Sequence, residues 1–499
     1  MSALHERSPG GDPPRVEPAR LAAALREILP GHSVLTGDEA IAPFECDGLS
    51  AYRQRPAAVV LPETVDQVQA LLRRMSALGV PVVTRGAGTG LSGGALPLAE
   101  AVLLVMTRFD RILSVDPANR CAIVQPGVTN AAISEAVRTH GLYYAPDPSS
   151  QIACSIGGNV AENAGGVHCL KYGLTVNNVR SLEIVTVDGE RLRLGSAALD
   201  GPGFDLTALL TGSEGMLGVI TEVTVDLLPL PPGRRVLLAA FDSVRAAGDA
   251  VATIIAAGIV PAGLEMMDAP AIRAAEAFCQ AGYPEDAAAM LLCELDGVED
   301  DVIEEASRVR RILESHGARD LREAVDEAEQ VRLWQGRKSA FPAVGRIAPD
   351  YYCMDGTIPR REIARVLEGI DELAAKHGLA VANVFHAGDG NLHPLILYDV
   401  SRPGDLEKAE RLGGEILELC VKAGGTITGE HGVGKEKIDQ MCVQFSPQEL
   451  AAFHGIKAAF DPRGLLNPGK AVPTLARCAE LGGMHVHGGA LPHPELERF

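Results

Sequence analysis

The sequence predicts an α+β protein built in two parts, and three observations lead to that prediction. Three glycine-rich blocks, at 85–98, 146–166 and around Gly212, Gly215 and Gly218, lie between strand-like runs of the first half. After residue 233, apolar strand-like runs alternate with amphipathic stretches, which favours a mainly antiparallel sheet covered by helices. The stretch "PLPPGRR" (229–235) has the composition of a boundary between the two parts.

Composition limits the classes of function. The chain has 499 residues, 46% apolar content and a net charge of −20, which fits a packed core and argues against nucleic acid or an anionic membrane surface as partner. No apolar run approaches the ~20 residues that span a bilayer. Residues 1–18 lack an apolar core between their charges, so we expect a disordered leader rather than a secretory signal, and a cytoplasmic protein that reaches a membrane only through partner subunits. Cysteine spacing contains no C-x-x-C pair, which excludes an iron–sulfur run in this chain.

The first elements read as strand, helix, strand. "AAVVLP" (57–62) and "VPVVT" (80–84) are short apolar runs. Between them, Thr64 stands three residues before Gln67, which predicts a capped helix over 64–79.

The block "RGAGTGLSGGALPL" (85–98) predicts a phosphate-binding loop without a helix. A dinucleotide-binding fingerprint needs a helix to begin inside the glycines, and Gly93, Gly94 and Pro97 prevent that. Backbone N–H groups in a glycine turn can still form an anion nest. An ordinary long loop is the alternative.

Further helices and strands are predicted after the first glycine block. Ser155 is expected to cap a short helix whose N-terminus would attract an anion, and Asp188-Gly189 predicts a hairpin. In the second half we expect strands at 236–241, 263–268 and 289–297, and helices at 243–258, 301–317 and 446–460.

The stretch "VFHAGDGNLHP" (384–394) places two histidines around an Asp-Gly turn. A two-residue turn at Asp389-Gly390 would put His386 directly opposite His393, with Cβ atoms about 5 Å apart on one face. Two imidazoles at that separation can bind one metal ion. A hairpin that merely contains two histidines is an equal alternative.

The three glycine blocks resemble the FAD-binding fold shared by vanillyl-alcohol oxidase and p-cresol methylhydroxylase. "HAGDGNLHP" and "GEHGVGKEK" are similar to the D-2-hydroxy acid dehydrogenase branch, and "LWQGRKSAFPAVGRIAPDYYCMDGTIPR" is closer still to the flavin subunits of bacterial glycolate oxidases. The similarity runs from about residue 20 to the end. It implies an FAD-binding domain of the p-cresol methylhydroxylase type at 19–232, an α+β substrate (cap) domain at 233–425, and a segment at 426–499 that returns to the flavin domain.

The resemblance also implies the cofactor site. Residues 85–95 contain no histidine, whereas many relatives attach FAD through one, so non-covalent FAD is implied. The implied cofactor-binding residues are Arg85, Gly86, Ala87, Gly88, Thr89, Gly90, Ser92, Gly93, Pro146, Asp147, Ser150, Ser155, Gly157, Gly158, Asn159, Asn163, Gly165, Gly166, Tyr172, Gly173, Glu214, Gly215, Gly218, Ile220 and Asn467, with Lys470 beside the last.

Oxidation of a 2-hydroxy acid needs a proton acceptor, a hydride acceptor and a group that polarises the hydroxyl. His386, His393 and Glu430 are expected to bind a divalent metal that suits zinc, with manganese or iron as alternatives. The neighbouring His431 is expected to be the general base. Adjacent residues of a strand point to opposite faces. Glu430 and His431 can therefore reach the same substrate only if the chain turns at this position.

Other residues are expected to contact the substrate. Arg337 is implied to bind the substrate carboxylate, with Thr357 and Asn391 as hydrogen-bonding candidates. Enzymes acting on D-2-hydroxyglutarate resemble this chain but carry a lysine near the position of Cys353, which favours a short monocarboxylate here. His485, His487 and His493 of the tail are expected to serve a partner or surface role rather than a metal site.

The sequence therefore predicts an FAD-dependent enzyme that oxidises glycolate and, as a second substrate, D-lactate. The resemblance implies an iron–sulfur subunit and a second flavin-domain subunit as partners. A stand-alone D-lactate or D-2-hydroxyglutarate dehydrogenase, a metal-dependent hydrolase and a non-catalytic FAD-binding subunit are the alternatives.

Overall fold

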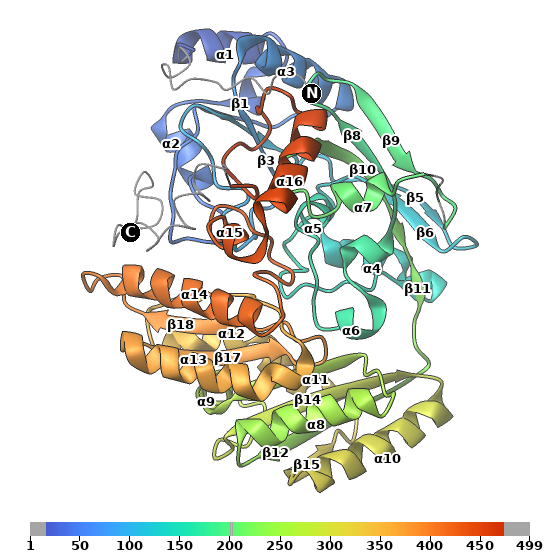
Figure 1. The fold of residues 1–499 in the computed structure, drawn as a ribbon. Helices are drawn as coiled ribbons and strands as arrows, with labels where there is room; N and C mark the ends of the chain where they lie inside the picture. The colour runs from blue at the N-terminus through green and yellow to red at the C-terminus, as the bar shows by residue number, and fades with distance from the viewer. Residues whose placement is uncertain (1–15, 200, 202, 474–499) are drawn as a thin grey trace.

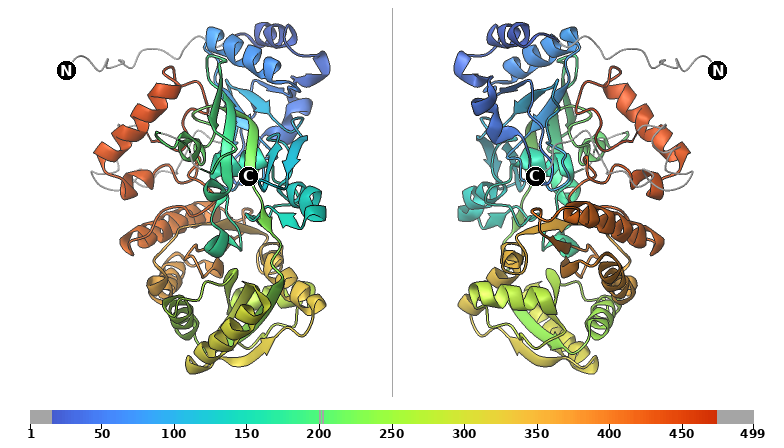
Figure 2. Two further views of the ribbon diagram at one scale, coloured as in Figure 1. Left: turned by 90° about the vertical axis from the view of Figure 1, so that its right-hand side faces the viewer. Right: turned by 90° about the vertical axis from the view of Figure 1, so that its left-hand side faces the viewer.

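The computed structural model describes residues 16–199, 201 and 203–473. The first half of the chain forms the upper part of the molecule in Figure 1, and the chain from β12 to α14 forms the lower part. The segment after α14 returns upward, so that α15 and α16 lie beside the first half, as the turned views of Figure 2 also show. The tail histidines expected to meet a partner lie outside the described residues.

A four-stranded sheet in the order β1-β2-β4-β3 carries the first glycine block at the end of β3. Its strands are β1 (Val34–Leu35), β2 (Ala58–Val60), β3 (Val82–Arg85) and β4 (Val102–Val105). The helix α3 (Val65–Leu78) connects β2 to β3, and the predicted capping box between Thr64 and Gln67 is confirmed. β3 and β4 run parallel, and the described residues between them contain no helix, as predicted.

An antiparallel sheet in the order β5-β6-β10-β8-β9 follows. Its strands are β5 (Ile112–Asp116), β6 (Cys121–Val124), β8 (Val179–Val185), β9 (Arg191–Gly195) and β10 (Val219–Asp226). The hairpin predicted at Asp188-Gly189 is confirmed, because β8 and β9 pair antiparallel on either side of it. The strands β7 (Leu142–Tyr143) and β11 (Leu228–Pro229) form a separate pair.

Short helices connect these strands. They are α1 (Pro18–Arg26), α2 (Asp38–Ile41), α4 (Asn130–Val137), α5 (Ile156–Glu162), α6 (Cys169–Tyr172) and α7 (Leu206–Leu210), with 3₁₀ turns η1 (Gly31–Ser33), η2 (Ala42–Phe44), η3 (Arg138–His140) and η4 (Thr175–Asn178). Of these, α5 carries the second glycine block toward the centre of the molecule (Figure 1).

The lower part contains a seven-stranded antiparallel sheet in the order β15-β12-β14-β13-β17-β18-β16. Its strands are β12 (Gly233–Phe241), β13 (Gly263–Asp268), β14 (Ala289–Gly297), β15 (Arg319–Glu323), β16 (Asp350–Cys353), β17 (Ala380–His386) and β18 (Pro394–Tyr398). Alternate residues of β12 enter two different hydrophobic clusters, so the sheet is buried on both faces.

Helices cover both faces of this sheet. One face packs on α8 (Val244–Ala256), α10 (Glu299–Ser315), α13 (Ile363–His377) and α14 (Asp405–Lys422). The other face packs on α9 (Ala269–Cys279), α11 (Glu327–Lys338) and α12 (Ala340–Ala343). The 3₁₀ turns η5 (Val344–Arg346) and η6 (Arg360–Glu362) complete this part. The mainly antiparallel sheet expected from the sequence is confirmed.

The chain after α14 joins the lower part to the upper one. It contains α15 (Met441–Gln444) and α16 (Pro447–Phe460). Leu466 then forms a parallel bridge to Val82 at the edge strand β3, and the Asn467 N–H donates to the Val82 carbonyl. Residues separated by almost 400 positions thus lie side by side next to the first glycine block.

Within the described ranges, none of the helices combines the length and apolar character that a membrane span requires.

Candidate active site

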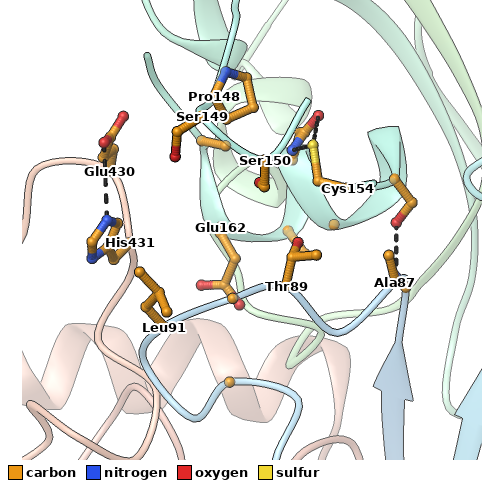
Figure 3. Close-up of a pocket in the computed structure, with 18 of the residues that line it drawn as sticks. Ala87, Thr89, Leu91, Pro148, Ser149, Ser150, Cys154, Glu162, Glu430 and His431 are labelled. Carbon is orange, nitrogen blue, oxygen red and sulfur yellow. Dashed lines mark hydrogen bonds and ion pairs between the residues drawn. The ribbon is translucent and has the colours of Figure 1, made fainter. Parts of the chain in front are cut away.

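A cavity of about 410 Å³ runs from the glycine blocks of the upper part to the sheet of the lower part. Figure 3 shows Thr89, Leu91 and Glu162 along it, with Glu430 and His431 at one end. The glycine blocks and the predicted metal ligands therefore line one continuous space.

The first glycine block lines the cavity with main chain. Gly88 has φ +76, a conformation that side chains rarely adopt. A Cβ at Gly86 would lie 2.2 Å from Ser155 Oγ, so the absence of side chains is what allows the block to approach α5. Ser155 stands at the N-cap position of α5 as predicted, but its hydroxyl accepts from the Ala87 N–H, 3.3 Å away, rather than capping its own helix. The expected cap hydrogen bond is thus wrong, because the nearby loop offers a competing donor.

The second block closes tightly around Asp147. A Cβ at Gly166, where φ is +150, would lie 2.4 Å from the Asp147 carbonyl oxygen. Asp147 itself contacts His168, whose Nδ1 lies 2.9 Å from its Oδ2. The other ring nitrogen of His168 lies 3.3 Å from Glu294 Oε1 on β14, which links the second block to the lower sheet. Burial alone would lower the pKa of His168, but Asp147 and Glu294 raise it to about 10.

Most residues predicted to bind the cofactor line this cavity. They are Gly86, Ala87, Gly88, Thr89, Gly90, Asp147, Ser150, Ser155, Gly157, Gly158, Asn159, Gly165, Gly166, Glu214, Gly215, Gly218 and Ile220. The cavity's lining does not include Arg85, Ser92, Gly93, Pro146, Asn163, Tyr172, Gly173 or Asn467, all of which are described.

Three of the residues outside the lining form hydrogen bonds to neighbouring segments. Asn467 Nδ2 donates to the carbonyls of Gly94 and Glu214, and so ties the returning segment to two glycine blocks. Arg85 donates to the Cys46 carbonyl, 2.5 Å away. Tyr172 donates to Asp296 on β14.

At the other end of the cavity, the three predicted metal ligands converge. Glu430 Oε1 lies 3.4 Å from His386 Nε2 and 3.2 Å from His393 Nε2. The ligand atoms of the three residues all lie within 4.8 Å of one another. Ligands of a tetrahedral zinc ion, at about 2.1 Å from the metal, stand roughly 3.4 Å apart. The donor types and spacing therefore fit a divalent metal.

The hairpin brings the histidines together in a register that differs from the predicted one. His386 pairs with Asn391, and Val384 rather than His386 lies opposite His393. The connection is a four-residue loop, in which Asp389 accepts from the Asn391 N–H and Gly388 donates to β13. The direct pairing predicted from the Asp-Gly turn is wrong, because the tertiary contact with β13 lengthens the loop. The histidines still share a face as diagonal neighbours, with ring centroids 5.0 Å apart.

A buried carboxylate that no sequence motif indicated orients the first ligand. Glu265 on β13 lies directly opposite His386, and its Oε1 is 2.8 Å from His386 Nδ1. This contact leaves Nε2 facing Glu430, as in carboxylate–histidine–metal arrangements. Burial opposes protonation, but Glu265 and Glu430 together raise the pKa of His386 well above its usual value. In the same way, His386 and His393 outweigh burial and hold the pKa of Glu430 well below its usual value.

Arg337 reaches the same carboxylate from α11. Its Nη2 lies 2.6 Å from Glu265 Oε2, and its side chain is only 6% exposed. Within the described part of the chain, its Nε and Nη2 make no hydrogen bond of good geometry. Arg337 lines the cavity, and Glu265 balances its charge.

The loop that carries Glu430 and His431 is turned by a second buried carboxylate. Asp355 Oδ2 accepts from three successive N–H groups, those of Gly429, Glu430 and His431, at 3.1, 2.9 and 2.7 Å. Lys437 forms an ion pair with the other oxygen of Asp355. Three consecutive amides converging on one oxygen curl the chain, so that two adjacent side chains both reach the cavity. The chain thus makes the turn that is needed if Glu430 is to bind a metal while His431 acts as the base.

His431 stacks on a ligand ring. Its ring lies 5.0 Å from that of His393 at an interplanar angle of 5°. Its Nδ1 lies 4.0 Å from Asp355 Oδ2, and its Nε2 lies 3.9 Å from Glu430 Oε1. Burial, joined by the charges of His393 and Lys437, lowers the pKa of His431 to about 4 despite Asp355.

Thr357 and Asn391 lie behind this loop, and the described cavity lining contains neither. Both side chains pack where a Cβ of Gly429 would be, 2.5 Å from Thr357 Oγ1 and closer still to Asn391 Nδ2. Their backbones are bridged to each other. The structure places them against the Glu430 loop, and their contact with a substrate stays a prediction.

Two acidic residues connect this loop to the glycine end. Glu214 accepts from the N–H groups of Val433 and Gly434, at 2.7 and 2.6 Å. Glu162, at the end of α5, lines the cavity, and its buried Oε2 makes no hydrogen bond within the described residues. Burial and then the charge of Glu214 raise the pKa of Glu162 well above its usual value. No sequence pattern pointed to Glu162, because its role depends on the loop that meets it.

Both expected groups fit the residues present. The glycine end offers main chain at the cavity wall, and at Gly90 an added Cβ would meet nothing within 4 Å, so open space lies next to the backbone there. The other end offers an imidazole nitrogen, His393 Nε2, that is buried and makes no hydrogen bond in the described structure. An elongated cofactor with phosphates suits the first end, and a divalent metal suits the second.

Comparisons with known proteins agree with this arrangement. The FAD binding domain family matches residues 56–195, and the family "FAD linked oxidases, C-terminal domain" matches residues 230–471. The chain is 67% identical to the glycolate oxidase subunit GlcD of Escherichia coli (strain K12) over all of both chains. It is 35% identical to the D-lactate dehydrogenase of Archaeoglobus fulgidus, covering 84% of this chain and 91% of the relative.

Solved structures show the same fold. The 4-ethylphenol oxidase from Gulosibacter chungangensis matches with a TM-score of 0.79 at 18% identity, covering 93% of this chain and 99% of that one. At this identity the likeness concerns the fold alone, and it bears out the α+β class predicted from the sequence.

Proposed function

Because the chain belongs to the family of FAD-linked oxidases, we propose that it oxidises a short 2-hydroxy acid, glycolate first and D-lactate second, to the 2-oxo acid. One observation carries the proposal: the glycine blocks and the cluster of His386, His393, Glu430 and His431 line a single cavity. The 67% identical relative is named a glycolate oxidase subunit, which agrees with glycolate, and the D-lactate dehydrogenase relative agrees with the second substrate.

Each group at the site has a separate task. When bound, FAD supplies a hydride acceptor, and a divalent metal supplies a Lewis acid that makes the substrate hydroxyl more acidic. His386, His393 and Glu430 hold the metal, and Glu265 fixes the orientation of His386. Arg337 lines the cavity beside this cluster and binds the substrate carboxylate through its guanidinium group.

His431 accepts the hydroxyl proton. Its Nε2 faces the side of Glu430, and its Nδ1 faces the carboxylate of Asp355 at 4.0 Å, which stabilises the imidazolium that forms. The stacked His393 ring limits its rotation. Asp355 thereby acts as a positioning residue that holds both the base and the third metal ligand.

The test is anaerobic flavin absorbance while glycolate, D-lactate, L-lactate and D-2-hydroxyglutarate are added separately, before and after chelation. Bleaching by glycolate or D-lactate that chelation abolishes and Zn²⁺ restores is the expected result. Bleaching by D-2-hydroxyglutarate alone would replace the substrate, and bleaching that survives complete metal removal would reject the metal role. Glu430→Gln supplies the matched variant, which should retain flavin and lose metal.

We also propose that FAD is bound non-covalently, since residues 85–95 contain no histidine. Acid precipitation should then release all flavin into the supernatant, whereas a yellow pellet would indicate a covalent bond.

Finally, we propose that electrons leave through an iron–sulfur subunit and a second flavin-domain subunit. The relative is named a subunit, and this chain has no cysteine pair suited to a cluster. Purification of the tagged chain from its own cells should yield iron and acid-labile sulfide in proportion to the chain. A pure single chain that reduces quinone at full rate would reject this assembly.

A further inference from the structure

Aromatic side chains form a wall next to the candidate metal cluster. Phe341 on α12 and Tyr351 on β16 line the cavity together with His386, His393 and His431. These two aromatic residues come from different elements of the lower part, and neither belongs to the candidate metal ligands or is the proposed base. Their position beside the cluster therefore calls for another role.

The wall is in direct contact with a candidate ligand. The Phe341 ring meets the His393 ring edge-on, with centroids 5.9 Å apart, and meets the Tyr351 ring edge-on at 6.1 Å. A small molecule held at the cluster is thus bounded by Phe341 on the side of His393. Tyr351 stands behind Phe341 and extends the wall toward a smaller neighbouring cavity, which it also lines.

Phe341 is supported from beneath. Its ring packs against the hydrophobic cluster that contains Ala340, Cys353 and Leu395. Cys353 is 5% exposed and points to the same face of β16 as Tyr351, yet the cavity's described lining does not include it. Phe341 therefore fills the space between the candidate metal cluster and this part of the strand.

The packing limits how far the wall can move. Ala340 and Ala343, on either side of Phe341 in α12, are fully buried, so the helix is anchored in the core. Phe341 itself is half-buried, with its ring packed against this core and also lining the cavity. A large displacement of the ring away from the cavity would require the close-packed core beneath it to shift. A substituent on the substrate would therefore meet a surface that is backed by the core.

We propose that Phe341, backed by Tyr351, sets the upper size of the substituent on the 2-hydroxy acid and thereby selects glycolate and D-lactate over longer acids. The inference rests on the proposed function and names the residue that determines its substrate range. One methylene in an apolar pocket changes kcat/KM by roughly 10–200-fold, so a single side chain is enough to produce such a selection.

The test compares flavin reduction rates for glycolate, D-lactate, D-2-hydroxybutyrate and D-2-hydroxyisovalerate in graded variants of the purified chain. In Phe341→Ala and Phe341→Leu, kcat/KM for D-2-hydroxyisovalerate relative to glycolate should rise about 10–100-fold, with the larger rise in the alanine variant. In Phe341→Trp, the ratio of D-lactate to glycolate should fall about tenfold. Phe204→Ala is the matched control, because Phe204 is 93% exposed and lies outside the cavity.

The possible results separate the two proposals. Unchanged substrate ratios in folded Phe341→Leu and Phe341→Trp, with glycolate still active, would overturn the inference and leave the proposed function standing. A wild-type flavin that no 2-hydroxy acid reduces would overturn both. If Phe341→Ala does not fold, Phe341→Leu and Phe341→Trp still test the proposal, because it predicts opposite changes in preference for larger substrates in these two variants.

Discussion

The two ends of the cavity differ in how far main chain or side chains form their surface. At the glycine end, much of the surface is main chain, and its shape depends on the absence of side chains at positions such as Gly86 and Gly166. At the other end, the surface is made of charged and aromatic side chains anchored on the antiparallel sheet, with buried carboxylates at Glu265 and Asp355 behind them. A cofactor common to many enzymes can be held by backbone, whereas a particular reaction needs particular side chains.

This contrast implies different sensitivities. We expect FAD binding at the glycine end to weaken when a Cβ is added to one of these glycines. At the end that carries the candidate metal cluster, removal of one buried charge should disrupt the site, because the neighbouring charges then lack a partner. The two kinds of damage should be separable, since the content of the proposed metal reports on one end and flavin content on the other.

The largest effect is expected from Asp355→Ala. Three amides of the 429–431 loop lose their common acceptor, so Glu430 and His431 should leave their positions. We expect flavin reduction by glycolate to slow by about 10²–10⁴-fold, with metal lost and flavin retained. Rapid-scanning absorbance and metal analysis provide the measurement.

Asp286→Ala is the matched control for Asp355→Ala, because the side chain of Asp286 is 76% exposed. The double variant with Lys437→Met removes the partner left unpaired by the first change and guards against simple misfolding. Near wild-type rate and metal content in folded Asp355→Ala would contradict the positioning role.

The next effect is expected from Gly166→Ala. The new Cβ would meet the Asp147 carbonyl at 2.4 Å in a conformation with φ +150. Strain of about 3 kcal/mol corresponds to a loss of FAD affinity on the order of 100-fold, with metal content unchanged. Titration of apoprotein with FAD measures the change.

Gly258→Ala is the control for Gly166→Ala, since Gly258 also has positive φ (+75) but has nothing within 4 Å of the position that a new Cβ would take. If Gly258→Ala lost as much FAD affinity as Gly166→Ala, general backbone strain rather than the shape of the cavity would explain the effect.

A smaller effect, on thermal stability, is expected at His168, which links the second glycine block to the lower sheet. Its pKa is about 10 in the folded protein, against 6.5 for the free side chain. A raised pKa means that the folded state binds the proton more tightly, so the stabilisation is complete below pH 6.5 and disappears as pH rises to about 10. His168→Gln should lower the melting temperature by about 5 °C at pH 6 and progressively less toward pH 10.

The exposed His140 supplies the comparison for that series, as His140→Gln should leave the melting temperature unchanged at every pH. A difference for His168→Gln that grows with pH would contradict the assigned ion pairs with Asp147 and Glu294.

The smallest effect is expected from Thr64→Ala, which removes the capping box of α3. Loss of an N-cap lowers the free energy of unfolding by about 1 kcal/mol. Denaturant unfolding should show this change, while FAD affinity, metal content and substrate ratios stay at wild-type values. A change in any of the last three would mean that α3 influences the cavity.

Local chemistry explains what could be predicted from the sequence. The cap at Thr64, the hairpin at Asp188-Gly189 and the helix-free glycine loop each depend on residues a few positions apart, and all three are confirmed. The residue types of the candidate metal cluster were likewise apparent, because two histidines and a carboxylate suit a divalent metal in any fold.

The sequence by itself determined several of the helices and strands, the glycine blocks and the set of candidate ligands. Only the tertiary structure decided how they meet. The register that brings His386 near His393 depends on β13, more than 100 residues earlier, and the turn at Glu430 depends on Asp355, about 75 residues earlier. Phe341 faces His393 only because α12 packs on the same sheet. Contacts of this kind join residues far apart in the chain, and local sequence carries no direct signal for them.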